Sequence, residues 1–142
     1  MPVSGVPQYD PTMSARFKDL VLDAGDHQAL ADWWCAALGY SRRVPPGGEE
    51  PPPREWPVPI HDPRGEGPLI WVSPVPEPKS VRNRMRLDVW GDTRELLGLG
   101  ATLVRRRTGE RNWDVLADPE GNEFCVFSPD PRTVPGVRLA RR

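Results

Sequence analysis

Residues that could bind an anion or a carbonyl group lie close together in segment 84–89. Arg84, Arg86 and Asp88 are two residues apart, and in an extended strand such residues share one face. Arginine forms paired, parallel hydrogen bonds with carboxylates and phosphates. The spacing therefore indicates an arginine-lined binding patch. A structural ion pair between one of these arginines and Asp19 or Asp88 fits the same residues equally well.

Other residues are expected to accompany this patch. The first and last predicted strands should bring Asp19 and Cys125 to the same face. Met85, Leu87 and Val89 alternate with the charged residues, so they should occupy the opposite face and pack against a helix.

Cysteine, histidine and tryptophan side chains offer further chemistry. A cysteine acts as a nucleophile when a base lies near it, but no Cys–His motif surrounds Cys125, which indicates an inert thiol. His61 ends a predicted strand and could reach the mouth of a cleft that contains the binding patch, whereas His27 is expected in solvent. Trp71 and Trp90 could stack on a flat ligand, or they could pack in the core or in a dimer interface.

The apolar pattern predicts two helices and eight strands that position these residues. Asp26 is suited to cap the first helix, and Gly39 is suited to end it. The buried face of this helix should contain Leu30, Trp34, Ala37 and Leu38. The helices are expected over 27–38 and 92–99, and the strands over 17–23, 40–44, 56–61, 69–73, 84–90, 102–107, 113–117 and 123–127.

Short motifs recur in the same order in both halves of the chain, which indicates a duplication. Each half therefore predicts a βαβββ module, and the fold class is α+β, with two modules in tandem around a shared, curved mixed-sheet cleft. The recurring pairs are Leu38–Gly39 with Leu99–Gly100, Trp56-x-Val58 with Trp113-x-Val115, and Asp62–Pro63-x-Gly65 with Asp118–Pro119-x-Gly121.

A chain of 142 residues suits one domain. Of its 19 prolines, most fall in the middle of the chain, inside the first module and at the joint between modules. We expect a flexible arm over 1–15, a single domain over 16–129 and a basic tail over 130–142. Within the domain, module one spans 16–74, the linker 74–83 and module two 84–129.

Composition excludes several classes of function. The formal net charge is −1, and there is no basic stripe of the kind that binds nucleic acid. No apolar run approaches the ~20 residues of a membrane span. The first residues lack the features of a signal peptide. The two cysteines are expected to be reduced thiols, so we expect a cytoplasmic protein.

This pattern resembles the vicinal oxygen chelate superfamily, which includes glyoxalase I, extradiol dioxygenases and bleomycin-resistance proteins, and within it the bacterial glyoxalase-like domain proteins. The resemblance covers about residues 16–129, and its most specific segment is DPEGNEF at 118–124. The other segments that carry it are Trp33–Trp34-x-x-x-Leu38–Gly39, Asn83–Arg84–Met85–Arg86–Leu87–Asp88–Val89 and Leu99–Gly100–Ala101.

The resemblance implies four positions for metal ligands on the concave face. In this sequence they hold Asp19, Leu69 or Ile70, Arg84 and Cys125. Arginine and aliphatic side chains do not ligate metals, and zinc usually takes at least three protein ligands. We therefore expect no metal and no other cofactor, although a divalent metal remains the alternative.

Two functions follow from the resemblance. The first is a protein that binds a small organic ligand in the inter-module cleft without the family's metal, with Asp19, Trp71, Arg84, Arg86, Asp88 and Cys125 as candidate ligand-binding residues. The alternative is a metal-dependent lyase, isomerase or dioxygenase acting on a vicinal-oxygen substrate. A third class is a structural or regulatory domain that binds a partner.

The resemblance also implies a homodimer. Size-exclusion chromatography with light scattering should give about twice the chain mass of 15.9 kDa. A mass equal to that of one chain would refute the prediction.

Overall fold

Both βαβββ modules are present in the computed structural model, which describes residues 12, 14, 16–44 and 50–128. The predicted tail 130–142, most of the predicted arm 1–15 and residues 45–49 lie outside the described residues. Module one contains β1 (Leu20–Ala24), α1 (His27–Leu38), β2 (Ser41–Arg42), β3 (Val58–His61) and β4 (Ile70–Pro74). Module two contains β5 (Leu87–Trp90), α2 (Thr93–Gly98), β6 (Thr102–Arg105), β7 (Asp114–Ala117) and β8 (Glu123–Phe127).

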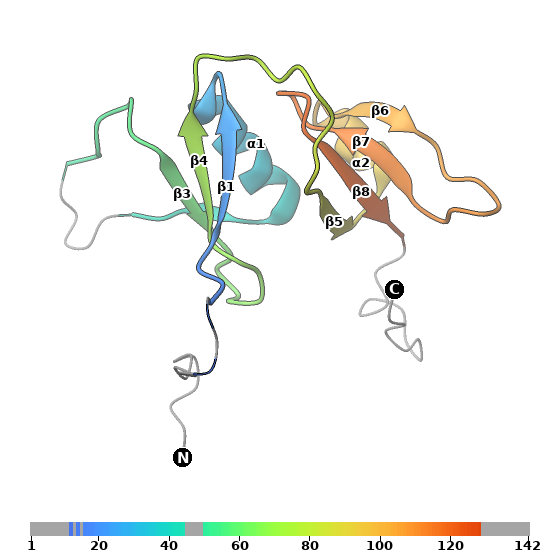
Figure 1. Ribbon diagram of the computed structural model, residues 1–142, viewed down its shortest axis with the longest axis horizontal. Coiled ribbons are helices and arrows are strands. Elements are labelled where there is room, and N and C mark those ends of the chain that lie inside the picture. Colours follow the sequence, from blue (N-terminus) through green and yellow to red (C-terminus); the bar gives the residue numbers. More distant parts are fainter. Residues whose placement is uncertain (1–11, 13, 15, 45–49, 129–142) are drawn as a thin grey trace.

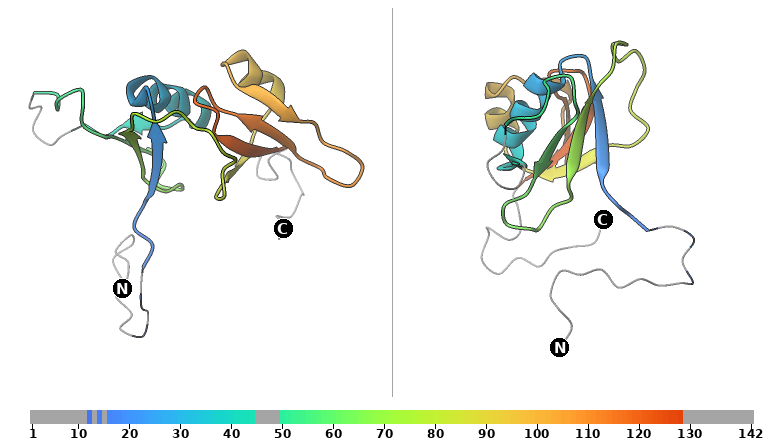
Figure 2. Two further views of the ribbon diagram at one scale, coloured as in Figure 1. Left: turned by 45° about the horizontal axis from the view of Figure 1, so that its top comes forward. Right: turned by 90° about the vertical axis from the view of Figure 1, so that its left-hand side faces the viewer.

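The two modules have the same sheet topology. The strand orders are β1-β4-β3-β2 and β5-β8-β7-β6. In each sheet the first and last strands of the module pair in parallel, and the other pairs are antiparallel. Figure 1 shows β1 and β5 as the edge strands nearest the other module. Figure 2 shows both helices on one side of the sheets, so the opposite faces are left uncovered by helices.

The sequence of α1 explains its limits and its buried face. The Asp26 side chain accepts a hydrogen bond from the backbone N–H of Ala29 at 3.1 Å, and Gly39 ends the helix in the left-handed conformation with φ of 70°. Leu30 and Trp34 are fully buried, as predicted, whereas Ala37 and Leu38 are only partly buried against the core. No helix among the described residues is long and apolar enough to cross a membrane.

The expectation that His27 lies in solvent is wrong. This residue is only 9% exposed, because the segment before β3 covers the first turn of α1. Its Nε2 lies 2.8 Å from the carbonyl oxygen of Arg54 and 3.0 Å from that of Trp56. His27 therefore holds the proline-rich loop against the helix.

Aromatic rings of α1 join the two modules. Trp33 and Trp34 each pack edge-to-face against Phe124 of β8, with ring centroids 6.0 and 5.0 Å away. Their indole N–H groups donate to module two as well: Trp33 to the carbonyl oxygen of Leu99 at 3.0 Å and Trp34 to the Asp118 carboxylate at 2.9 Å. Such paired burial and hydrogen bonding is how large amphipathic rings stabilise an interface.

The strand predicted over 84–90 begins only at Leu87. Arg84 and Arg86 are therefore not strand residues, and Met85 is 81% exposed rather than packed against a helix. Leu87 and Val89 do pack against the core. The pairing of β5 with β8 starts at Leu87 and Phe124. The side chain of the preceding residue of β8, Glu123, binds the linker.

Loss of the Asp118 carboxylate should destabilise the joint between modules. Asp118→Ala removes the acceptor of the buried indole N–H of Trp34 and of backbone N–H groups in its own turn. We therefore expect the free energy of unfolding to fall by about 3 kcal/mol. The matched control is Asp62→Ala, which removes the equivalent turn carboxylate of module one but no bond between modules. Urea denaturation should show a smaller loss for the control. Equal losses would contradict a special role for the indole bond.

Candidate functional site

A cleft of about 570 Å³ opens between the two modules. Its lining comes from β1, from Trp34 of α1, from the segment between β4 and β5 (residues 75–86, called the linker from here on), and from the beginnings of β5 and β8, together with Glu120 and Asn122 of the turn that precedes β8. The cleft is thus built by residues from both modules and by the segment that joins them.

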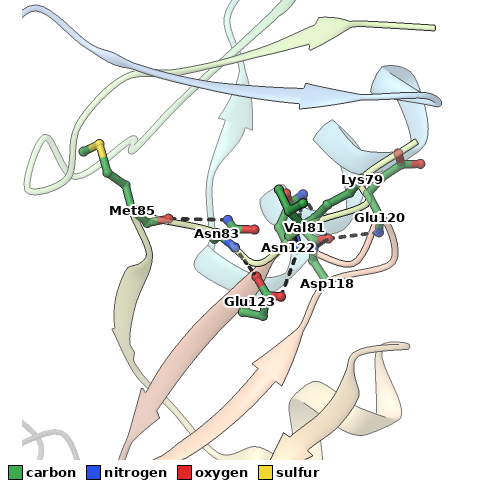
Figure 3. Close-up of polar contacts among 8 residues, drawn as sticks. All are labelled: Lys79, Val81, Asn83, Met85, Asp118, Glu120, Asn122 and Glu123. Atoms are coloured by element: carbon green, nitrogen blue, oxygen red, sulfur yellow. Dashed lines mark hydrogen bonds and ion pairs between the residues drawn. The ribbon is translucent and has the colours of Figure 1, made fainter. Parts of the chain in front are cut away.

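The linker is fastened to module two by Glu123 (Figure 3). The Glu123 carboxylate accepts hydrogen bonds from Lys79 Nζ at 3.0 Å and from the backbone N–H of Asn83 at 2.9 Å. Lys79 Nζ also donates to the carbonyl oxygen of Val81. Burial alone raises the pKa of Glu123, but the bonds from Asn83 and Lys79 outweigh it and hold that pKa below its ordinary value. The carboxylate is therefore ionised at neutral pH.

A second carboxylate on the same turn reaches module one. Glu120 accepts hydrogen bonds from the backbone N–H groups of Gly25 at 2.7 Å and Asp26 at 3.3 Å. The backbone of Glu120 is in turn fixed by the Asp118 carboxylate, which accepts its N–H at 2.9 Å. The turn 118–122 therefore positions the residues between β1 and α1 through Glu120, and Glu123, which directly follows the turn, positions the linker.

Arg84 and Arg86 are the two predicted site residues that line the cleft. Both are exposed, and within the described part of the chain neither forms a hydrogen bond or an ion pair. The alternative of a structural ion pair with Asp19 or Asp88 is therefore not realised. Sequence reasoning missed Arg82, which also lines the cleft and continues the same two-residue spacing.

Asp19 and Trp71 are brought together, but not at this cleft. The indole N–H of Trp71 donates to the Asp19 carboxylate at 2.9 Å, and Lys18 Nζ donates to it at 2.7 Å. The bond from Lys18 is the main reason that the pKa of Asp19 is lowered; partial burial opposes this shift, and the bond from Trp71 adds to it. Neither residue is among those that line the cleft, although Trp71 is the cross-strand neighbour of Val21, which does line it.

Asp88 and Cys125 are cross-strand neighbours of β5 and β8, again away from the cleft lining. Cys125 is 1% exposed, because it occupies a central strand between Asp88 and Val115. Cys125 is not among the residues that line the cleft, and its burial agrees with the expectation of an inert thiol.

His61 and Trp90 also lie outside the cleft. His61 ends β3, and its Nδ1 is buried without a hydrogen-bond partner among the described residues. Trp90 packs edge-to-face on Phe127, with ring centroids 5.9 Å apart. Trp90 thus belongs to an aromatic cluster of module two rather than to the inter-module site.

The side chains at the family's metal positions do not fit a divalent ion. Within residues 16–44 and 50–128, no three His, Cys, Asp or Glu side chains lie together in an arrangement that could hold a metal. Asp19 is engaged by Lys18 and Trp71, and Cys125 is buried in its sheet. A metal site needs three or more converging donors, and these residues do not supply them.

Removing the Glu123 carboxylate should release the linker. In Glu123→Ala the amide of Asn83 loses its acceptor, so its hydrogen exchange should accelerate by about tenfold. Glu95→Ala, which alters an exposed acidic residue of α2, should leave that exchange unchanged. The pKa of Glu123 is lowered in the folded chain. The difference in Asn83 exchange rate between variant and wild type should therefore be complete above pH ~4.3 and should disappear as pH falls through that lowered pKa. Unchanged exchange of Asn83 at neutral pH would show that Glu123 does not hold the linker.

Comparison with known proteins agrees with this architecture. Residues 19–127 match the sequence family described as the glyoxalase-like domain, and no curated protein matches the chain. The fosfomycin resistance protein FosX from Mesorhizobium loti is 11% identical, with 83% of this chain and 94% of that chain covered and a TM-score of 0.60. FosX from Listeria monocytogenes has 10% identity, the same coverage and a TM-score of 0.60.

A glyoxalase/bleomycin resistance protein/dioxygenase family enzyme from Burkholderia phytofirmans is 17% identical, with 79% of this chain and 97% of that chain covered and a TM-score of 0.55. At these identities the structural likeness concerns the fold. The match of the sequence family spans most of the chain, including both modules and the turn 118–122. The chain therefore belongs to the glyoxalase-like domain family.

Proposed function

We propose that this protein binds a small organic ligand in the inter-module cleft and does so without a metal at the family position. The observation that carries the proposal is the cleft itself, which is about 570 Å³ and lies at the joint of the two modules. Ligand sites of proteins are concave, combine apolar walls with a few polar groups, and favour such joints. Three exposed arginines of the linker line it beside apolar residues.

Two carboxylates that already have their hydrogen-bond donors hold the walls of the binding surface in place. Glu123 holds the linker and Glu120 holds the start of α1, so the two walls are fixed before a ligand arrives. A site fixed in this way loses less conformational entropy on binding. Arg84 and Arg86 remain available for a ligand because no residue of the described chain engages them.

The alternative function, a metal-dependent lyase, isomerase or dioxygenase, requires a different donor set. The family positions hold a hydrogen-bonded Asp19, an aliphatic residue, Arg84 and a buried Cys125. Titration with nickel, zinc, manganese and iron distinguishes the two functions. Stoichiometric binding of any of these ions in the cleft would favour the enzyme and contradict the proposal.

Filling part of the cleft should weaken ligand binding. Val21 lines the cleft from β1 and is 57% exposed, so Val21→Trp adds bulk there without disturbing the core. We expect this variant to bind the neutral fluorescent probe N-phenyl-1-naphthylamine about tenfold more weakly than the wild type. The matched control is Val104→Trp, on an exposed strand position outside the cleft lining. Failure of the wild type to bind the probe, or equal binding by Val21→Trp, would overturn the proposal.

A further inference from the structure

Some charged side chains of the cleft have hydrogen-bond or ion-pair partners among the described residues, and others have none. Glu123 is neutralised by Lys79 and by a backbone N–H, and Glu120 is held by two backbone N–H groups. These two carboxylates are therefore committed to holding the walls. Lys79 compensates the charge of Glu123, whereas the backbone donors satisfy the oxygens of Glu120 without cancelling its negative charge.

The unsatisfied basic groups are concentrated in one part of the linker. Arg82, Arg84 and Arg86 line the cleft just before β5 begins. Within the described chain, none of the three has a hydrogen-bond or ion-pair partner. Guanidinium groups in this state attract a carboxylate, a sulfonate or a similar oxyanion, with which they form charge-assisted hydrogen bonds.

Two unsatisfied acidic groups lie towards the other end of the linker. Asp23 is close to the end of β1, which pairs with the end of β4, and Glu77 follows β4 by three residues. Both line the cleft. Figure 3 shows the linker running between the Glu120 end of the site and Met85. Glu120 binds the backbone N–H of Gly25, and the backbone N–H of Val75 binds the carbonyl oxygen of Ala24, so Asp23 and Glu77 belong to the Glu120 end. Arg84 and Arg86 are the sequence neighbours of Met85.

Exposed apolar side chains complete the lining. Val21 of β1 and Val81 and Met85 of the linker are each more than half exposed, although all three line the cleft. Apolar surface left open in a concave site is stabilised when a ligand removes it from water. A ligand that matches the cleft therefore carries an apolar body as well as a charge.

We propose that the ligand is a singly charged organic anion with an apolar body, whose anionic group is bound by Arg84 and Arg86. The inference rests on the proposed function of the same cleft and adds the chemical class of the ligand. Asp23 and Glu77 restrict that class, because a second negative charge on the ligand would be repelled at their end of the cleft.

A pair of probes with the same aromatic framework tests the class. 1-Anilinonaphthalene-8-sulfonate carries one sulfonate, whereas N-phenyl-1-naphthylamine lacks it. Fluorescence titration of the full chain should give an affinity for the sulfonate about tenfold higher than for the neutral probe. The double variant Arg84→Gln and Arg86→Gln should lose this preference and still bind the neutral probe. Arg94→Gln, which alters an exposed arginine of α2 outside the cleft, should retain it.

Competition experiments test the limit on charge. Naphthalene-1-sulfonate should displace the bound anionic probe at about a fivefold lower concentration than naphthalene-1,5-disulfonate, since only the second carries a charge that Asp23 and Glu77 repel. In Asp23→Asn with Glu77→Gln, the two competitors should become equally effective. Circular dichroism of each variant confirms that loss of binding is not loss of fold.

The outcomes separate this inference from the proposed function. Binding of the neutral probe that depends on Val21, without any preference for the sulfonate, would overturn the anionic class and leave the binding cleft intact. A preference for the sulfonate that survives in the double arginine variant would also overturn it. Stronger displacement by the disulfonate would refute the restriction to one charge.

Discussion

The buried hydrogen bond between the indole of Trp34 and the carboxylate of Asp118 is the contact on which the arrangement of this molecule depends. Asp118 is 2% exposed, and a buried carboxylate is costly unless donors surround it. Its donors are the indole N–H, the backbone N–H groups of Glu120 and Asn122 and the Asn122 side chain. Because these donors come from both modules, satisfying the carboxylate requires the modules to be joined.

The consequences of that one contact extend to the cleft. A turn fixed in this way directs Glu120 to the start of α1 and Glu123 to the linker (Figure 3). The two walls of the cleft are thus connected through the six residues from Asp118 to Glu123. The arginines then need no internal partner to be held in place, because the backbone that carries them is anchored by Lys79 and Asn83.

The duplicated halves use the same turn for different purposes. In module one Asp62 accepts the backbone N–H groups of Arg64, Glu66 and Gly67, as Asp118 does for its own turn. The Asp62 turn, however, bonds only to its own module among the described residues. Sequence identity between the copies therefore marks a shared local geometry, and the position of each copy decides which turn joins the modules.

The sequence by itself determined the elements, the duplication and the family. Local signals sufficed there, because an N-cap at Asp26, a left-handed Gly39 and alternating apolar residues act within a few residues of the chain. It also singled out Arg84 and Arg86.

Only the tertiary structure decided where the side chains meet. Cys125 lies in β8 and Asp19 directly precedes β1; the first is buried in its sheet and the second is bound by Trp71. The burial of His27 likewise depends on the loop before β3, which is distant from it in sequence. A short-range pattern predicts the direction of a side chain within its element, but satisfaction of buried polar groups by distant donors selects its final surroundings.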